Sequence, residues 1–215
     1  MRARRTTAST DALLDSRAPA WAEAAATAVA LVPAPVTMAA AVSPQLALSQ
    51  SHGAVKSLAT AALHDGRTLS VRLAWADPTR DDAIRDLDRF ADAAAIMFPL
   101  REGAISVTMG DAERPVNVWL WRSDQAEPYD VIAHGYSTSQ RRAANASGLA
   151  ARGHHEEGGW AVVLQRALRP RSAEFAAFEP GTTGKIAFAV WDGSNAERAG
   201  QKAVSGAFVD LPLDP

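Results

Sequence analysis

The sequence predicts a mainly β protein: an antiparallel β-sandwich with one or two inserted helices and an extended N-terminal arm. Apolar residues alternate with other residues over several short segments, most clearly over residues 69–75, as in a strand that buries one face. Turn-forming residues separate these segments. Prolines 19, 33, 35 and 44 interrupt the first 50 residues before any periodic run is long enough for an element.

These observations place an arm over residues 1–50, which we expect to lie on a partner subunit, and a domain over residues 51–215. Residues 55–63 and 68–75 should form a hairpin around His64-Asp65-Gly66-Arg67. A helix capped by Asp81 or Asp82 should follow and end at Phe98-Pro99. It is predicted from the spacing of Ile84, Leu87, Ala91, Ala94 and Ala95. Further strands are expected over residues 104–108, 115–122, 129–137, 159–168, 184–191 and 206–211.

Composition excludes several kinds of function. The 215 residues carry 22 Lys and Arg against 24 Asp and Glu, a net charge of −2, so no strong field would gather nucleic acid or an anionic membrane. The absence of cysteine excludes disulfides, thiol nucleophiles, iron–sulfur ligation by this chain and covalently attached c-type haem. No apolar run reaches the length of a spanning helix, so we expect no membrane insertion, and we expect no export signal of its own.

Few residues point to catalysis. No G-x-S-x-G elbow occurs, and His154-His155 lie in a Gly- and Glu-rich tract that we interpret as a solvated turn before the Trp160 strand. Taken alone, Met109 is best interpreted as a residue that fills a gap in the core, and Lys202 as a surface ammonium.

Motifs over nearly the whole chain change that interpretation. They are Ala20-Trp21-Ala22, Val42-Ser43-Pro44 with Leu46-Ala47-Leu48-Ser49, His52-Gly53, Ala61-Ala62-Leu63-His64, Met97-Phe98-Pro99, Val107-Thr108-Met109-Gly110, Arg114-Pro115-Val116-Asn117, the segment from Lys185 to Trp191, and Asn195-Ala196-Glu197-Arg198. With these motifs the sequence resembles the haem b subunit of the type II dimethyl-sulfoxide-reductase family. It is most similar to the gamma subunit of ethylbenzene dehydrogenase and of its steroid-hydroxylating relatives.

The resemblance implies a non-covalent b-type haem with Met109 and Lys202 as the two axial ligands of the iron. A thioether favours ferrous iron and raises the reduction potential, whereas an amine ligates only after it has lost its proton. With both axial positions filled, such a haem passes electrons and does not activate a substrate.

Other residues of the same types are weaker candidates. Met97 is the first alternative to Met109, and Met38 in the arm is weaker; neither Lys185 nor Lys56 matches the position of the family's lysine. Three tryptophans, Trp119, Trp121 and Trp191, are expected in the core or against the macrocycle. Arg114 and Arg198 fit two roles equally well: an ion pair with a haem propionate, or a solvated position on the surface.

The resemblance also implies the setting. The chain would not be an enzyme by itself. It would be the electron-transfer subunit of a heterotrimer, beside an iron–sulfur beta subunit and an alpha subunit that holds a molybdenum pterin and hydroxylates a hydrocarbon or steroid. Electrons would leave for an external acceptor such as a soluble cytochrome, and the complex would be periplasmic, exported with the catalytic subunit.

Two alternatives remain at this point. A β-sandwich with exposed tryptophans is typical of carbohydrate-binding modules, and fold alone does not decide between the functions. The chain is also compatible with a structural subunit that has lost its haem, although it retains both candidate ligands.

Overall fold

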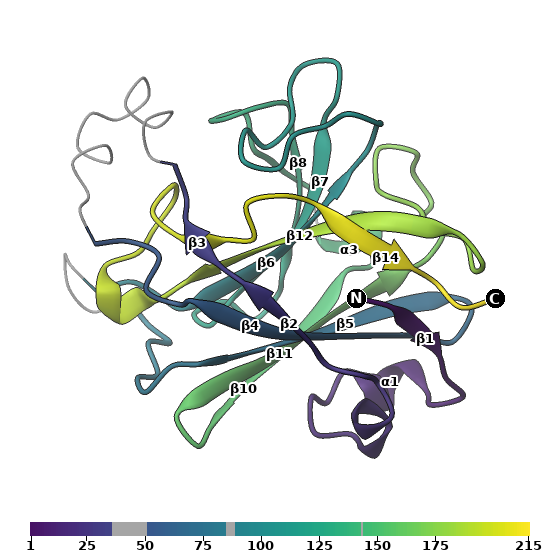
Figure 1. The fold of residues 1–215 in the computed structure, drawn as a ribbon, viewed down its shortest axis with the longest axis horizontal. Coiled ribbons are helices and arrows are strands. Elements are labelled where there is room, and N and C mark those ends of the chain that lie inside the picture. The colour runs from purple at the N-terminus through teal and green to yellow at the C-terminus, as the bar shows by residue number, and fades with distance from the viewer. Residues whose placement is uncertain (36–50, 85–88, 143) are drawn as a thin grey trace.

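The computed structural model describes residues 1–35, 51–84, 89–142 and 144–215. Two β-sheets face each other, and the described ranges add four short helices, so the predicted mainly β, antiparallel sandwich is confirmed (Figure 1). No helix in these ranges is long and apolar enough to cross a membrane.

The first sheet is built on the predicted hairpin. β4 (Ser57–His64) and β5 (Thr68–Ala76) pair antiparallel, followed by β11 (Gly159–Ala167) and β10 (Ala150–Glu156). The turn forms because Asp65 Oδ1 accepts hydrogen bonds from the amides of Arg67 and Thr68, at 2.8 and 2.7 Å. Two N-terminal strands, β1 (Ala3–Arg5) and β2 (Thr27–Ala30), pair with β4 along its other edge.

The second sheet has the order β3 (Val32–Pro33), β13 (Ala203–Val204), β12 (Thr183–Trp191), β6 (Ala93–Pro99), β7 (Val116–Arg122), β8 (Tyr129–Ala133) and β9 (Gln140–Arg142). β14 (Val209–Pro212) pairs with the first half of β12. The helices in the described part of the chain are α1 (Thr10–Leu13), η1 (Pro19–Ala22), α3 (Ala144–Ser147) and η3 (Gly193–Asn195).

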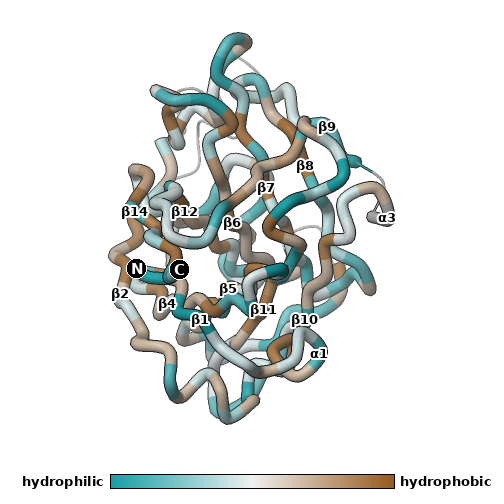
Figure 2. Tube along the Cα trace, turned by 90° about the vertical axis from the view of Figure 1, so that its right-hand side faces the viewer, coloured by the Kyte–Doolittle hydropathy of each residue, from teal (hydrophilic) through white to brown (hydrophobic). Residues whose placement is uncertain are grey.

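Aromatic side chains from both sheets meet between them. The indoles of Trp75 and Trp160, in the first sheet, stand edge to face with Trp121 of the second, at centroid distances of 6.4 and 4.9 Å. Phe98 makes the same kind of contact with the fully buried Trp119 at 4.8 Å. Figure 2 shows the hydrophobic stretches of the inner strands, such as β7 and β11, lying towards the middle of the molecule. Burial of these aromatic rings supplies much of the driving force for folding.

The predicted helix ending at Phe98-Pro99 is wrong over residues 93–99, which form β6. This segment is a continuous apolar run buried on both faces of a sheet, and residue spacing alone cannot distinguish such a run from a buried helix. Ile84, expected on its buried face, is 57% exposed, while Leu87 lies outside the described residues.

Three smaller predictions also need correction. Residues 104–108 form turns, not a strand, and the strand expected to reach residue 137 ends at Ala133, before Gly135 and Ser137 adopt positive φ. His154 and His155 lie within β10, not in a turn, because the chain reverses only at Glu157 and Gly158.

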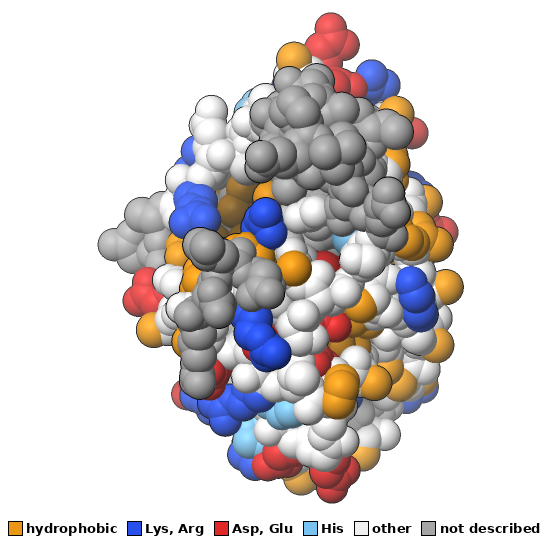
Figure 3. Space-filling model, turned by 90° about the vertical axis from the view of Figure 1, so that its left-hand side faces the viewer, with side chains coloured by type: hydrophobic (Ala, Val, Ile, Leu, Met, Phe, Trp, Pro, Cys, Tyr) orange, Lys and Arg blue, Asp and Glu red, His pale blue; other side chains and the backbone are white. Residues whose placement is uncertain are grey.

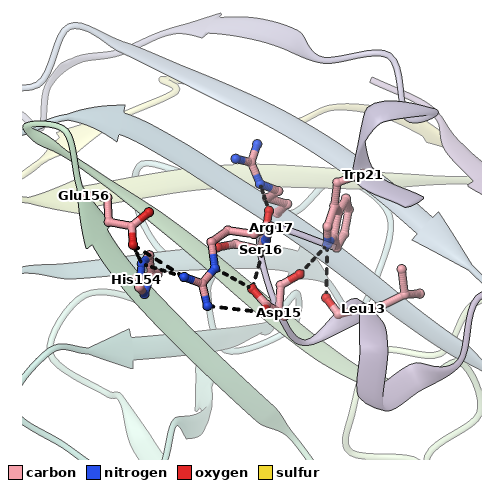
Figure 4. A network of polar contacts seen from close by, with 8 residues as sticks. Leu13, Asp15, Ser16, Arg17, Trp21, His154 and Glu156 are labelled. Atoms are coloured by element: carbon pink, nitrogen blue, oxygen red, sulfur yellow. Dashed lines mark hydrogen bonds and ion pairs between the residues drawn. The ribbon is translucent and has the colours of Figure 1, made fainter. Parts of the chain in front are cut away.

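The described part of the predicted arm, residues 1–35, packs on this chain's own sheets. Trp21 is buried against the outer face of the first sheet, and its indole N–H donates to the carbonyls of Leu13 and Asp15, both at 3.1 Å (Figure 4). Arg17 reaches from the same segment to His154 and Glu156 of β10. β1 also lies beside the C-terminus, so residues on both sides of the predicted boundary at residue 50 contact each other. Residues 36–50 of the arm lie outside the described residues.

Candidate functional site

Both faces of the second sheet are apolar. One face packs in the core, and the candidate site lies on the other. Alternate residues of β6, β7 and β12 point into the core, among them Phe98, Trp119 and Phe188. The residues between them form the opposite face together with Val131 of β8 and Val204 of β13. Most of those from β6, β7 and β12 are small: Ala95, Met97, Val118, Leu120, Ala187 and Ala189. An apolar face of small side chains leaves a recess on the sheet.

A cavity of about 410 Å³ lies on this recess, within the size range of small-molecule sites. Its walls come from four segments far apart in the sequence: Ala34-Pro35, the loop containing Ser106, Val107 and Met109, the segment from Tyr136 to Arg141, and the segment from Ala199 to Gly206. Met109 and Lys202 both line it.

Met109 sits on a rigid turn. Its backbone has φ 58°, its amide donates to the Ser106 carbonyl, and its own carbonyl accepts from the Gly135 amide, both at 3.0 Å. Gly110 follows with φ 74°, and a Cβ there would lie 2.3 Å from the Arg114 carbonyl oxygen. The turn therefore places the Met109 side chain against the apolar face of the sheet.

We expect Gly110→Ala to disrupt this turn, because alanine meets both the backbone clash and a left-handed strain of about 1–2 kcal/mol. Gly181→Ala is a matched control, since Gly181 has φ 82° but no atom within 4 Å of its built Cβ. Thermal unfolding should show a clearly larger loss of Tm for Gly110→Ala than for Gly181→Ala. Equal losses would contradict the role assigned to the turn.

Lys202 lies in the segment between η3 and β13. Its Nζ is 4.8 Å from the ring centroid of Trp191, whose indole N–H donates to the Ala199 carbonyl at 3.1 Å. Within the described ranges no carboxylate forms an ion pair with it. Burial lowers the pKa of Lys202 to about 8, because the charged form loses its solvation. The neutral amine that a metal requires is thus accessible near neutral pH.

Glu197 anchors the segment that carries Lys202. This carboxylate is 1% exposed, and its Oε1 accepts from the amides of Gly53 and Ala54, at 2.7 and 2.8 Å. Its Oε2 accepts from the Asp192 amide at 3.1 Å. Gly53 is required here, since a Cβ would lie 2.7 Å from Pro33 Cα. The His52-Gly53 and Asn195-Ala196-Glu197-Arg198 motifs, distant in the sequence, are therefore in direct contact.

The alternative residues occupy different places. Met97 lines the same cavity as Met109. Lys185 pairs with Asp210 on the surface at 2.9 Å, and Lys56 Nζ donates to the Gly53 carbonyl. Met38 lies outside the described residues. Among the tryptophans, Trp119 and Trp121 are in the core, whereas Trp191 lines the cavity.

Neither arginine expected near a propionate lines the cavity. Arg114 is exposed and pairs with Asp111 at 2.7 Å, and the Arg198 guanidinium lies over Phe90. Arg141 lines the cavity instead, with its guanidinium carbon 4.1 Å from the Tyr129 ring centroid. It was missed because residues 129–137 were expected to continue as a strand, and no motif marks the loop that follows.

The described tryptophans do not form the flat, exposed platform that stacks against a sugar ring. Five of the six tryptophans are at most 7% exposed, and Trp191 is half-buried in the cavity, so none forms an exposed platform. On the face drawn in Figure 3, basic and acidic side chains of the described residues are interspersed with hydrophobic ones.

Comparison with known proteins gives consistent results. A family profile described as ethylbenzene dehydrogenase matches residues 18–152 and 144–203. The chain is 39% identical over 153 residues to the chlorate reductase subunit gamma of Ideonella dechloratans and 37% identical over 152 residues to the dimethylsulfide dehydrogenase subunit gamma of Rhodovulum sulfidophilum. It is 35% identical over 163 residues to a protein of Haloferax mediterranei named provisionally as a respiratory nitrate reductase heme subunit.

These matches cover 71%, 67% and 74% of this chain, but only 63%, 56% and 58% of the respective relatives, so the chain spans about six-tenths of their length. Among solved structures, a provisionally named carbohydrate-binding protein of Bacteroides uniformis has a TM-score of 0.61 at 11% identity, covering 100% of this chain and 98% of that one. A family 9 carbohydrate-binding module of Caldicellulosiruptor kristjanssonii bound to glucose has a TM-score of 0.52 at 12% identity, covering 100% and 96%. At these identities the likeness is one of fold.

Proposed function

Because the chain belongs to the ethylbenzene dehydrogenase family, we propose that it is an electron-transfer subunit that holds a b-type haem between Met109 and Lys202. The observation that carries this proposal is that the two residues, on separate loops, line one apolar cavity. A b-type haem taken up there supplies one-electron chemistry at its iron.

The cavity residues suit such a group. The floor is hydrophobic, as a macrocycle requires, and Met109 brings a soft thioether to it from a rigid turn. Lys202 brings an amine whose proton is easily lost. Arg141 is the basic group on the cavity wall that would face a propionate, in place of Arg114 and Arg198.

The names of the relatives support the setting. Two are gamma subunits and one is named as a heme subunit, which supports a place for this chain in a multi-subunit complex. We propose that its partners there are a catalytic and an iron–sulfur subunit. In this proposal it takes electrons from the iron–sulfur subunit of a periplasmic, molybdenum-dependent hydrocarbon or steroid hydroxylase and passes them to an external acceptor such as a soluble cytochrome.

An absorption spectrum of the purified chain, or of its complex, tests the proposal. We expect a low-spin, six-coordinate b-type spectrum that changes reversibly when dithionite reduces the iron. A folded, colourless protein that does not take up added haem would contradict it. Binding of glucose or cellotriose by such a protein would favour the carbohydrate-binding alternative.

Haem affinity should also depend on pH. Below the Lys202 pKa of about 8, binding to the iron must displace a proton, so affinity should rise about tenfold per unit between pH 6 and 8 and level off above. Absorbance titrations of the haem-free chain with haem at pH 6, 7, 8 and 9 measure this. In Lys202→Ala the slope should disappear. The same slope in that variant would refute the assignment of Lys202.

A further inference from the structure

Three aspartates outside the haem cavity meet at one end of the sandwich. Asp77 directly follows β5, Asp92 directly precedes β6, and Asp192 directly follows β12. Trp191 pairs with Ala93 across β12 and β6, so Asp192 and Asp92 emerge side by side from the second sheet, while Asp77 comes from the first. One carboxylate oxygen of each lies within 4.8 Å of those of the other two.

The negative charges of these three carboxylates are not balanced by cationic side chains of the described residues. Asp77 is 1% exposed and Asp92 is fully buried, and no lysine or arginine in the described parts of the chain forms an ion pair with any of the three. Burial raises the pKa of Asp92 to about 6, and burial together with the Asp192 charge raises the pKa of Asp77. Like charges this close are unfavourable unless a cation or a proton joins them.

Asp77 presents a buried oxygen that lacks a well-aligned donor. Its Oδ1 accepts from the amide and the hydroxyl of Thr79, at 3.1 and 3.0 Å. Its Oδ2 is buried and has no hydrogen bond of standard geometry within the described residues; the Trp75 indole N–H, which also has no other partner there, is close enough to lower the pKa of Asp77. An unpaired buried carboxylate oxygen costs free energy unless a ligand occupies the position next to it.

The surrounding donors hold the other two carboxylates in place. Asp92 Oδ1 accepts from the Gly193 amide at 2.8 Å, and Oδ2 accepts from the Asp81 amide at 2.8 Å and the Trp160 indole at 2.9 Å. Asp192 Oδ1 accepts from Ser194 and Asn195. Such outer hydrogen bonds orient metal ligands and keep them ionised.

We infer that Asp77, Asp92 and Asp192 bind a calcium ion that links the two sheets. The donor set contains only oxygen, which excludes a preference for zinc, and carboxylates of mixed burial suit the larger, flexible coordination of Ca²⁺ better than the strict octahedron of Mg²⁺. The ion would also restrain the end of β12, because Asp192 directly follows this strand and the chain continues from there to Glu197 and Lys202.

Calorimetric titration of the full chain with CaCl₂ at pH 7.5, after removal of metal with EDTA, tests this inference. We expect one Ca²⁺ per chain with a Kd at or below about 1 mM. In thermal unfolding, Ca²⁺ at 100 times Kd should raise the ratio of folded to unfolded protein about 100-fold. Both readouts are independent of haem. A negative result with calcium would therefore not change the absorption spectrum expected from the haem proposal.

The variant Asp77→Asn/Asp192→Asn removes two ligands but leaves the more deeply hydrogen-bonded Asp92. It should lose the calcium response, while Asp210→Asn, a change at an exposed carboxylate, should keep it. Should the double variant fail to fold, Asp77→Asn alone should weaken calcium binding at least about tenfold. The inference is overturned by a wild-type chain that shows no response to 10 mM Ca²⁺, by an equal response in a folded variant, or by an equal response to Mg²⁺.

Discussion

Met109→Ala and Lys202→Ala should each abolish the low-spin, six-coordinate haem spectrum that we propose for this protein. Each change removes one proposed axial donor, so the iron becomes five-coordinate or takes water, and haem retention should fall by about tenfold or more. For Met109→Ala the reduction potential of any haem that remains should also fall, since the thioether favours the ferrous state. Absorption spectra of both oxidation states and a redox titration measure these effects.

Two variants serve as controls for the ligand assignment. Met97→Leu changes the other methionine of the same cavity while nearly conserving volume, and Lys185→Ala removes a surface lysine. Both should keep the wild-type spectrum. Circular dichroism establishes that each variant is folded. A wild-type spectrum in folded Met109→Ala, or a spectrum lost only in Met97→Leu, would show that Met97 or another residue is the ligand.

The second large effect concerns a buried ion pair between the sheets. Arg166 of β11 and Asp130 of β8 are both fully buried and meet at 2.6 Å, and Asn117 bonds to both of them. Asp130→Ala leaves the guanidinium without its counter-charge in the core, so we expect a loss of about 3–5 kcal/mol in the free energy of unfolding. At this chain length that is a fall in Tm of roughly 6–20 °C.

Urea denaturation measures this loss. Asp210→Ala, which breaks the exposed pair with Lys185, should leave the urea midpoint almost unchanged, because solvent screens both charges. The double variant Arg166→Met/Asp130→Leu should recover part of the stability, because it leaves no charge unpaired. A loss below 1 kcal/mol for Asp130→Ala would mean that water reaches Arg166 and that the pair is not a core element.

Local patterns predicted the strands well where one face of the strand is polar or a turn marks its end. Residues 68–75 alternate, and Asp65-Gly66 closes the hairpin, so β4 and β5 were confirmed nearly to the residue. β6 was not predictable in this way. It is apolar on both faces, since one face meets the core and the other meets the cavity. Its residues therefore do not alternate between apolar and polar, which is the pattern that identifies a strand.

The sequence by itself determined the sandwich, the exclusion of cysteine chemistry and, through family motifs, Met109 and Lys202 as candidates. Only the tertiary structure decided that these two residues share one cavity, that Arg141 and not Arg114 or Arg198 lines it, and that Asp77, Asp92 and Asp192 converge. The physical reason is that alternation and turn chemistry act over a few residues. Which strand ends and loops meet depends instead on sheet order and on burial between segments far apart in the chain.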